Sequence, residues 1–153
     1  MAGPRSLAIA LAAVVLAGYV GAAPCAAAET ANITVIQIRA TQGDGPKQVD
    51  PKLSSLRAKL VVLPYQKFEL IGKFQGAAAY DEETVIALAE GFSLKASPRK
   101  EPGRRDRIGL GIAVLKGGRP LLFTSLLVRP GGVGFLTCPS ADGSATILAV
   151  SAR

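Results

Sequence analysis

Short stretches in which apolar and polar residues alternate, separated by turns rich in glycine and proline, make up most of this chain. The alternation is clearest at 107–114, where every second residue is a large aliphatic one. A period of two places successive side chains on opposite faces of a strand. The turn signals recur at roughly 8–14-residue spacing, which is typical of antiparallel sandwiches and barrels. We therefore predict a mainly β fold, an antiparallel sandwich or open barrel of about seven or eight strands.

Two of the predicted strands depart from simple alternation. At 32–39, the neighbouring residues Val35 and Ile36 are both apolar, which predicts either a bulge or a strand buried on both faces. Every residue of Val85–Ala89 is apolar, so we expect a central strand with both faces covered. A polar loop is predicted at 97–106. Further strands are predicted at 65–74, 92–96, 107–114, 121–128, 133–138 and 146–150.

One segment has the period of a helix instead. Asp50 is a favoured N-cap residue, and Pro51 suits the first helical position because its missing N–H would be unpaired there anyway. Pro64 disfavours helical geometry in the residue before it. We therefore predict one amphipathic helix over Asp50–Leu63, lying across the sheet. Its apolar stripe consists of Leu53, Leu56, Leu60 and Leu63.

The apolar positions of these elements define an expected core. It consists of Ile33, Val35, Ile38, Leu53, Leu56, Leu60, Phe68, Leu70, Phe92, Leu94, Ile108, Leu110, Ile112, Val114, Phe123, Leu136, Ile147 and Ala149.

Residues 1–28 have the three parts of a secretory signal. Arg5 is their only charged residue, Ser6–Ala23 is almost wholly apolar, and 26–28 are three alanines. We predict a signal peptide at 1–28 and a single β-rich domain at 29–153, exported to the periplasm or secreted. The alternative is a leader that is not cleaved and serves as a membrane anchor, although Ser6–Ala23 is slightly shorter than the about 20 residues of a usual span.

The residues that most enzymes and metal sites need are scarce. The chain has no histidine, and of its two cysteines Cys25 belongs to the predicted leader. Nucleophile pairs with histidine and thiolate zinc sites are thereby excluded. We predict a protein that is not an enzyme, with no catalytic residue, metal site or cofactor. The remaining Cys138 is expected to be a buried hydrophobic residue, the alternatives being a reactive thiol or an intermolecular disulfide.

A cluster of basic residues is the main candidate binding feature. The chain has a net charge of +7, and five of its cations lie within nine residues. They are Arg99, Lys100, Arg104, Arg105 and Arg107. We expect them to contact an anionic partner, either an envelope protein or an anionic polymer, unless they belong to a solvated loop. Nucleic acid is not expected, because no aromatic residues interleave for base stacking, and the membrane is expected to be contacted only through an uncleaved leader.

Small residues mark a second candidate surface. Gly109, Gly111 and Ala113 occupy one face of the strand at 107–114, so another backbone can approach closely there. This face either packs against another part of the domain or forms a docking groove for a partner strand.

Three sequence blocks carry a resemblance. They are Val49–Leu53 with Leu56 and Leu60, Leu63–Leu70, and Arg129–Gly132 leading to the strand Ile147–Val150. Together they resemble a loose group of small exported bacterial proteins without assigned activity. The resemblance implies an exported β-rich protein and no catalytic or ligand residues. From the export signal, the scarcity of catalytic residues and the β-rich pattern, we expect a non-enzymatic interaction module of the cell envelope, the alternative being a barrel that carries a small apolar ligand.

Overall fold

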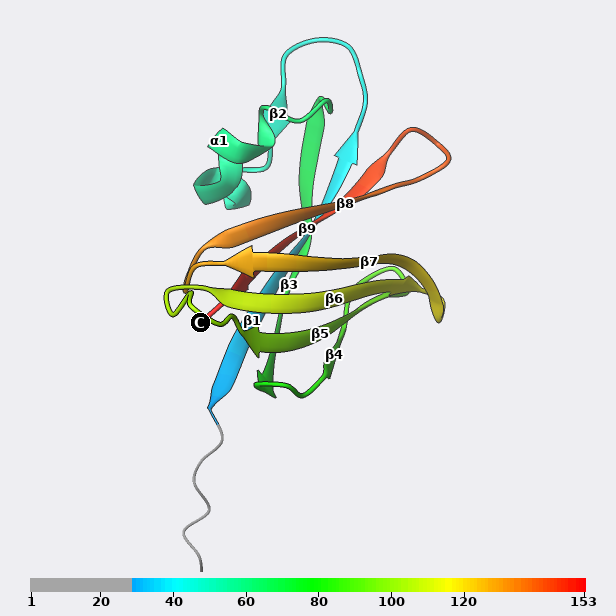
Figure 1. Cartoon of the computed structure of the whole chain (residues 1–153). Helices are drawn as coiled ribbons and strands as arrows, with labels where there is room; N and C mark the ends of the chain where they lie inside the picture. The colour runs from blue at the N-terminus through cyan, green and yellow to red at the C-terminus, as the bar shows by residue number, and fades with distance from the viewer. Residues whose placement is uncertain (1–28) are drawn as a thin grey trace, which may run out of the picture.

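The computed structural model describes residues 29–153, which form nine strands in two sheets and a short helical segment (Figure 1). The predicted signal peptide lies outside the described residues and stays a prediction. The strands are β1 (Thr30–Thr41), β2 (Gln48–Val49), β3 (Lys67–Ala79), β4 (Thr84–Ala87), β5 (Phe92–Lys100), β6 (Ile108–Lys116), β7 (Arg119–Val128), β8 (Val133–Pro139) and β9 (Ala145–Ala152). The helical segment is the 3-10 turn η1 (Pro51–Leu56) followed by α1 (Arg57–Leu60).

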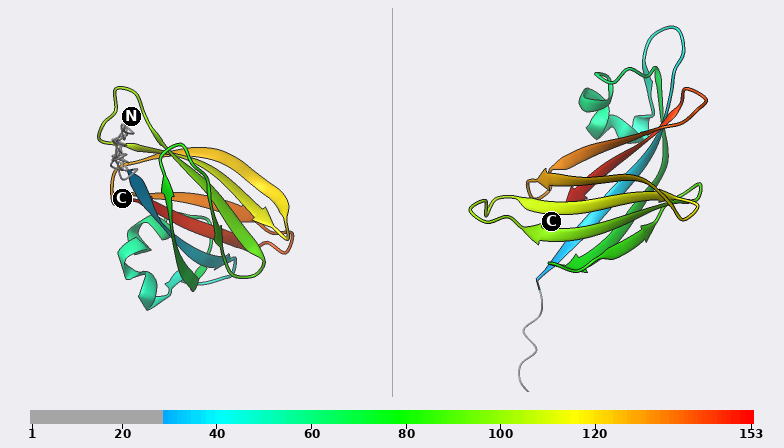
Figure 2. Two further views of the ribbon diagram at one scale, coloured as in Figure 1. Left: turned by 90° about the horizontal axis from the view of Figure 1, so that it is seen from below. Right: turned by 45° about the vertical axis from the view of Figure 1, so that its right-hand side comes forward.

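The two sheets pack face to face, as expected for a sandwich. The five-stranded sheet has the order β2-β3-β1-β9-β8, and the four-stranded sheet has the order β4-β5-β6-β7. All pairings are antiparallel except that of the two-residue β2 with β3. Figures 1 and 2 show the four-stranded sheet curling across one face of the other, with the helical segment on the opposite face. The predicted fold class, a mainly β sandwich or open barrel with one helix, is confirmed.

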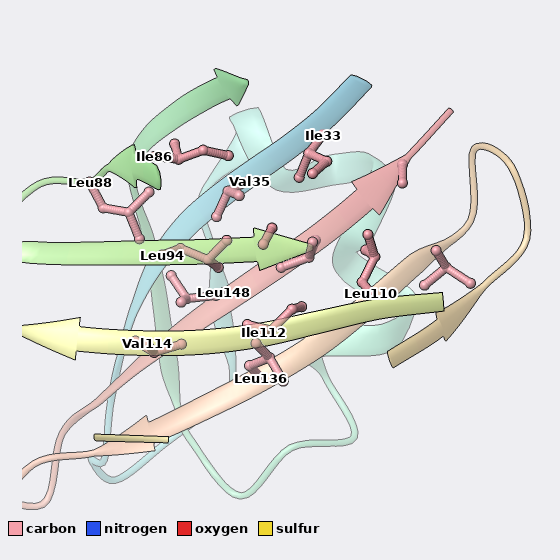
Figure 3. Close-up of a cluster of buried hydrophobic side chains, with 14 of the residues drawn as sticks. Ile33, Val35, Ile86, Leu88, Leu94, Leu110, Ile112, Val114, Leu136 and Leu148 are labelled. Carbon is pink, nitrogen blue, oxygen red and sulfur yellow. The ribbon is translucent and has the colours of Figure 1, made fainter. Parts of the chain in front are cut away.

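Two hydrophobic clusters hold these layers together. The larger cluster fills the space between the sheets and includes Ile33, Leu94, Leu110 and Leu148 (Figure 3). The smaller cluster lies between the five-stranded sheet and the helical segment, centred on Phe68 and Leu60. The five-stranded sheet is therefore buried on both faces at the end that carries the helical segment.

Of the two predicted explanations for the adjacent apolar residues in β1, burial on both faces is the one that applies. Val35 belongs to the cluster between the sheets, whereas Ile36 packs against the cluster under the helical segment. The pairing of β1 with β3 also shifts register, because Gln37 pairs with Gly72 while Ile38 pairs with Leu70. The extra residue, Ile71, belongs to β3, so this bulge does not interrupt the alternation of side chains along β1.

The helical segment is shorter than the predicted helix over Asp50–Leu63. It begins as a 3-10 turn, is kinked at Leu53 (φ −99°, ψ 17°), and ends as a single α-turn at Leu60. The three residues per turn of a 3-10 helix bring Leu53 and Leu56 into line, so the leucine stripe is still buried. Lys47 Nζ donates hydrogen bonds to the carbonyls of Val61 and Leu63, which have no helical partners after this early end.

Asp50 joins the start of this segment to β3. Its carboxylate accepts hydrogen bonds from the N–H groups of Lys52 (3.0 Å) and Leu70 (3.3 Å). The bond from Lys52 is the main reason that the pKa of Asp50 lies below its ordinary value. A carboxylate with a lowered folded-state pKa stabilises the protein above its unfolded pKa and loses that effect as pH falls through the folded one.

We therefore expect Asp50→Asn to lower the denaturation midpoint at pH 7, because its amide NH2 cannot accept the bond from Leu70. The difference from the unsubstituted protein should begin to shrink as pH falls below about 4, the pKa of an unfolded aspartate, and should be lost once pH falls through the lower pKa of Asp50 in the folded protein. Chemical denaturation over this pH range measures this. Asp44→Asn, in the exposed loop after β1, is the control. A difference that does not change with pH would contradict the assignment.

Three other expectations are wrong. β4 is an edge strand rather than a central one, so Val85 is 57% exposed while Ile86 faces the core. Phe123, predicted to be a core residue, is 73% exposed. The first part of the predicted loop at 97–106 belongs to β5, which continues to Lys100. Among the other expected core residues, Leu70 is half-buried and the rest are buried.

Within residues 29–153, we find no helix that is both long enough and apolar enough to span a bilayer.

Candidate basic pocket

Several segments that are distant in sequence meet at one end of the sandwich. The left view of Figure 2 shows the β5–β6 loop beside the start of β1 and the end of β9. Asn32 and Arg153 exchange two backbone hydrogen bonds, of 2.9 and 3.0 Å, which tie the last described residue to β1. The N–H of Gly131 donates to the carbonyl of Ala152 (2.9 Å), so the β7–β8 turn is held there too.

The β5–β6 loop consists of two successive turns. Arg104 N–H donates to the carbonyl of Glu101 (3.2 Å), and Arg107 N–H donates to the carbonyl of Arg104 (3.2 Å). Pro102 and Gly103 occupy the centre of the first turn, and Gly103 has a φ of +77°. Proline followed by a glycine of positive φ is the residue pair that a type II turn requires. The sequence thus places its arginines on a defined double turn.

A pocket of about 470 Å³ opens between these segments. Four arginines line it, three from the β5–β6 loop and one that directly follows β9, and we call them the arginine rim. The rim consists of Arg104, Arg105, Arg107 and Arg153. Three less polar residues also line the pocket, and we call them the apolar floor. The floor consists of Tyr80, which is half-buried, Ile108, which is buried, and Pro130, which is exposed. The whole is the basic pocket, which also contains Lys100, Glu29 and Glu101.

The two carboxylates in the basic pocket contact residues other than the arginine rim. Glu29 forms an ion pair with Lys100, and this contact raises the pKa of Lys100. Lys100 Nζ also lies 5.2 Å from the centre of the Tyr80 ring. The carboxylate of Glu101 lies over Gly109, where its Oε1 would be 2.8 Å from an added Cβ. The lining has five cations and two carboxylates, and it therefore keeps an excess of positive charge.

The arginine rim has no carboxylate partner within 4.0 Å in the part of the chain that the structure describes. The ion pairs found in residues 29–153 are Arg39–Glu90, Lys67–Glu69, Lys95–Glu83 and Lys100–Glu29. Four guanidinium groups thus line one pocket without internal neutralisation. Such a site attracts anions, because repulsion among the cations is relieved when an anion binds.

The structure brings together four of the five predicted site residues. Lys100, Arg104, Arg105 and Arg107 line the basic pocket, but Arg99 does not. Successive side chains of a strand point to opposite faces, and Arg99 therefore lies on the outer face of the four-stranded sheet.

Sequence analysis missed Arg153 and the apolar floor. Arg153 reaches the pocket because β9 pairs with β1 antiparallel, which brings the residue after β9 beside the start of β1. Tyr80 is placed at the pocket by its N–H, which donates to the carbonyl of Glu29 (3.2 Å). The sequence carries turn signals near these residues, but no local pattern indicates which turns meet.

The predicted small-residue face points away from the five-stranded sheet. Gly111 and Ala113 line a shallow groove of about 510 Å³ on the outer face of the four-stranded sheet, beside Phe123. Gly109, at one end of this face, is buried below Glu101. A larger hollow of about 700 Å³, on the outer face of the five-stranded sheet, is lined mainly by uncharged residues with Lys73 and Arg153. Neither hollow gathers cations as the basic pocket does.

Other reactive chemistry is sparse among residues 29–153. Cys138 is buried and unpaired in this range, and burial raises the pKa of its thiol. A thiol with a raised pKa forms little of the reactive thiolate at neutral pH. No three side chains of Cys, Asp or Glu in the same range are grouped so that they could hold a metal ion.

Comparisons with protein-family models, with curated proteins and with solved structures find no significant match.

Proposed function

We propose that this protein is a non-enzymatic interaction module of the bacterial cell envelope, and that the basic pocket binds an anionic partner. The observation that carries the proposal is the arginine rim, whose four guanidinium groups lack carboxylate partners within residues 29–153. The predicted export signal supports the location. The partner is an anionic polymer or an acidic region of an envelope protein.

The alternative of an apolar-ligand carrier has less support. Buried side chains, among them Leu94, Ile112 and Leu148, occupy the space between the two sheets (Figure 3). The hollows described above lie on the outer faces and at the end of the sandwich. They favour contacts made at the surface over enclosure of a ligand.

Binding to polyphosphate and to dextran sulfate, measured by fluorescence anisotropy, tests the anionic partner. Exposed charges act over a Debye length of about 10 Å at 0.1 M salt and only about 3 Å at 1 M. We therefore expect affinity to fall several-fold as salt rises across that range. The double substitution Arg104→Ala with Arg105→Ala should weaken binding at low salt by about tenfold or more. It should leave the thermal midpoint almost unchanged, because exposed charges contribute little to folding.

The matched control is the double substitution Arg99→Ala with Arg119→Ala. It removes the same net charge from exposed residues that do not line the basic pocket. If both double variants weaken binding equally, net charge rather than the pocket attracts the anion. Binding that responds neither to salt nor to either variant would refute the proposed function.

A further inference from the structure

We infer that the basic pocket takes a phosphate ester with a compact apolar body. The phosphate lies on the arginine rim, and the body lies against the apolar floor. This inference rests on the proposed function, and it names the chemical class of the ligand. Two features of the pocket carry it: the kind of cation on the rim and the presence of apolar side chains beside it.

The rim favours phosphate over carboxylate. A guanidinium group is a planar fork that donates two parallel hydrogen bonds, and this geometry fits phosphate oxygens well. A carboxylate has two oxygens, which one such fork satisfies. A phosphate monoester has three terminal oxygens and a charge of about −1.5 to −2 near pH 7. Four arginines without carboxylate partners in residues 29–153 match the larger charge and the larger number of acceptors.

The two acids of the pocket do not cancel this excess. Glu29 is already engaged by Lys100. Glu101 turns toward Gly109, at the border with the outer face of the four-stranded sheet. Three rim arginines come from the β5–β6 loop, and the fourth, Arg153, directly follows β9. Two segments that are distant in sequence therefore supply the cations, which do not lie along one strand.

The floor favours a ligand with more than a bare phosphate. Ile108 is 5% exposed, Tyr80 is half-buried, and both line the same hollow as the rim. Its volume of about 470 Å³ lies within the range of small-molecule sites, about 300–1,000 Å³. Each methylene group that leaves water for such a surface improves affinity by about fourfold. An inorganic phosphate cannot use the floor, whereas an alkyl or ring-bearing ester covers it.

A ligand series on the purified protein separates these contributions. Isothermal calorimetry compares inorganic phosphate, butyl phosphate and pentanoate. We expect butyl phosphate to bind about tenfold or more tightly than inorganic phosphate, since part of its chain is buried. We also expect it to bind more tightly than pentanoate, which has a similar apolar chain but a carboxylate. Equal affinity for butyl phosphate and inorganic phosphate would overturn the apolar part of the inference, and equal affinity for butyl phosphate and pentanoate would overturn the phosphate part.

Substitution at the rim locates the binding. Arg153→Gln should weaken the binding of butyl phosphate and of inorganic phosphate by the same factor, about fivefold to tenfold, because it removes one charged hydrogen-bond donor. Arg129→Gln is the matched control, because Arg129 is an exposed arginine of the β7–β8 turn that does not line the pocket. An equal effect of the two substitutions would place the ligand elsewhere and overturn the inference.

Binding to vesicles of phosphatidylcholine that contain phosphatidic acid tests whether the ester is a lipid headgroup or a soluble molecule. Binding to these vesicles that is displaced by butyl phosphate supports a lipid headgroup as the source. Binding of butyl phosphate without vesicle binding supports a soluble ester. Salt-sensitive binding to dextran sulfate together with equal affinities across the ligand series would defeat this inference alone. Absence of binding to every anion would defeat the proposed function as well.

Discussion

Replacing Phe68 with alanine is expected to lower the free energy of unfolding by about 3–5 kcal/mol. Phe68 is 1% exposed and lies in the cluster that joins the helical segment to the five-stranded sheet. Its ring meets Tyr65 edge to face, with centroids 6.4 Å apart. Removing the ring leaves a cavity that neighbours such as Leu53 and Leu60 cannot fill, because they are held by the helical segment above the sheet. Urea denaturation followed by circular dichroism measures the loss.

The matched control is Phe123→Ala, the same chemical change on another strand. Phe123 is 73% exposed, so its ring buries little apolar surface in the folded protein and its removal leaves no cavity in the core. We expect a change within about 0.5 kcal/mol, the usual range for surface substitutions. Similar losses for the two variants would contradict the burial that separates these residues.

Replacing Gln37 with leucine is expected to lower the free energy of unfolding by about 2–4 kcal/mol. The Gln37 side chain is fully buried, although it is polar. Its Nε2 donates to the carbonyl of Ala89 (3.2 Å), and its Oε1 accepts from the N–H of Ala89 (2.9 Å). This pair of bonds links β1 of one sheet to the turn between β4 and β5 of the other. Leucine has a similar size but leaves the N–H of Ala89 without a partner, and the Ala89 carbonyl keeps only the bond from the N–H of Phe92 (3.2 Å).

Urea denaturation measures this loss, and amide hydrogen exchange at Ala89 locates it. The Ala89 amide should exchange faster in Gln37→Leu than in the unsubstituted protein. Gln75→Leu is the control, because Gln75 is exposed on β3. A loss below about 1 kcal/mol for Gln37→Leu would mean that water replaces the two bonds without cost.

Local pattern identified the strands and much of the core. At 107–114 glycine, alanine or arginine separates the large aliphatic residues, so only one face of β6 can be apolar and bulky. The expected burial of Ile108, Leu110, Ile112 and Val114 is confirmed for that reason. The Pro102–Gly103 pair likewise determines a turn between β5 and β6, because these residues favour its backbone angles.

Where both faces of a strand are apolar, the pattern cannot say which face is covered. In β7, Leu122 and Leu126 pack on the core, whereas Phe123 and Leu127 lie on the other face beside β6. In β4, the same ambiguity concerns Val85 and Ile86. Which face of such a strand is buried depends on the position of the strand in its sheet and on what lies above each face.

The basic pocket shows the same division. The sequence by itself determined a cluster of cations on a turn, and the alternation of side chains along β5 separates Arg99 from Lys100. Only the tertiary structure decided that Arg153 and Tyr80 join this cluster, because antiparallel pairing of β1 with β9 and with β3 brings them to the same end. The alternation of side chains along a strand depends on neighbouring residues, whereas these strand pairings depend on contacts between residues that are distant in sequence, such as Thr30 with Ala79 and Ile33 with Ala152.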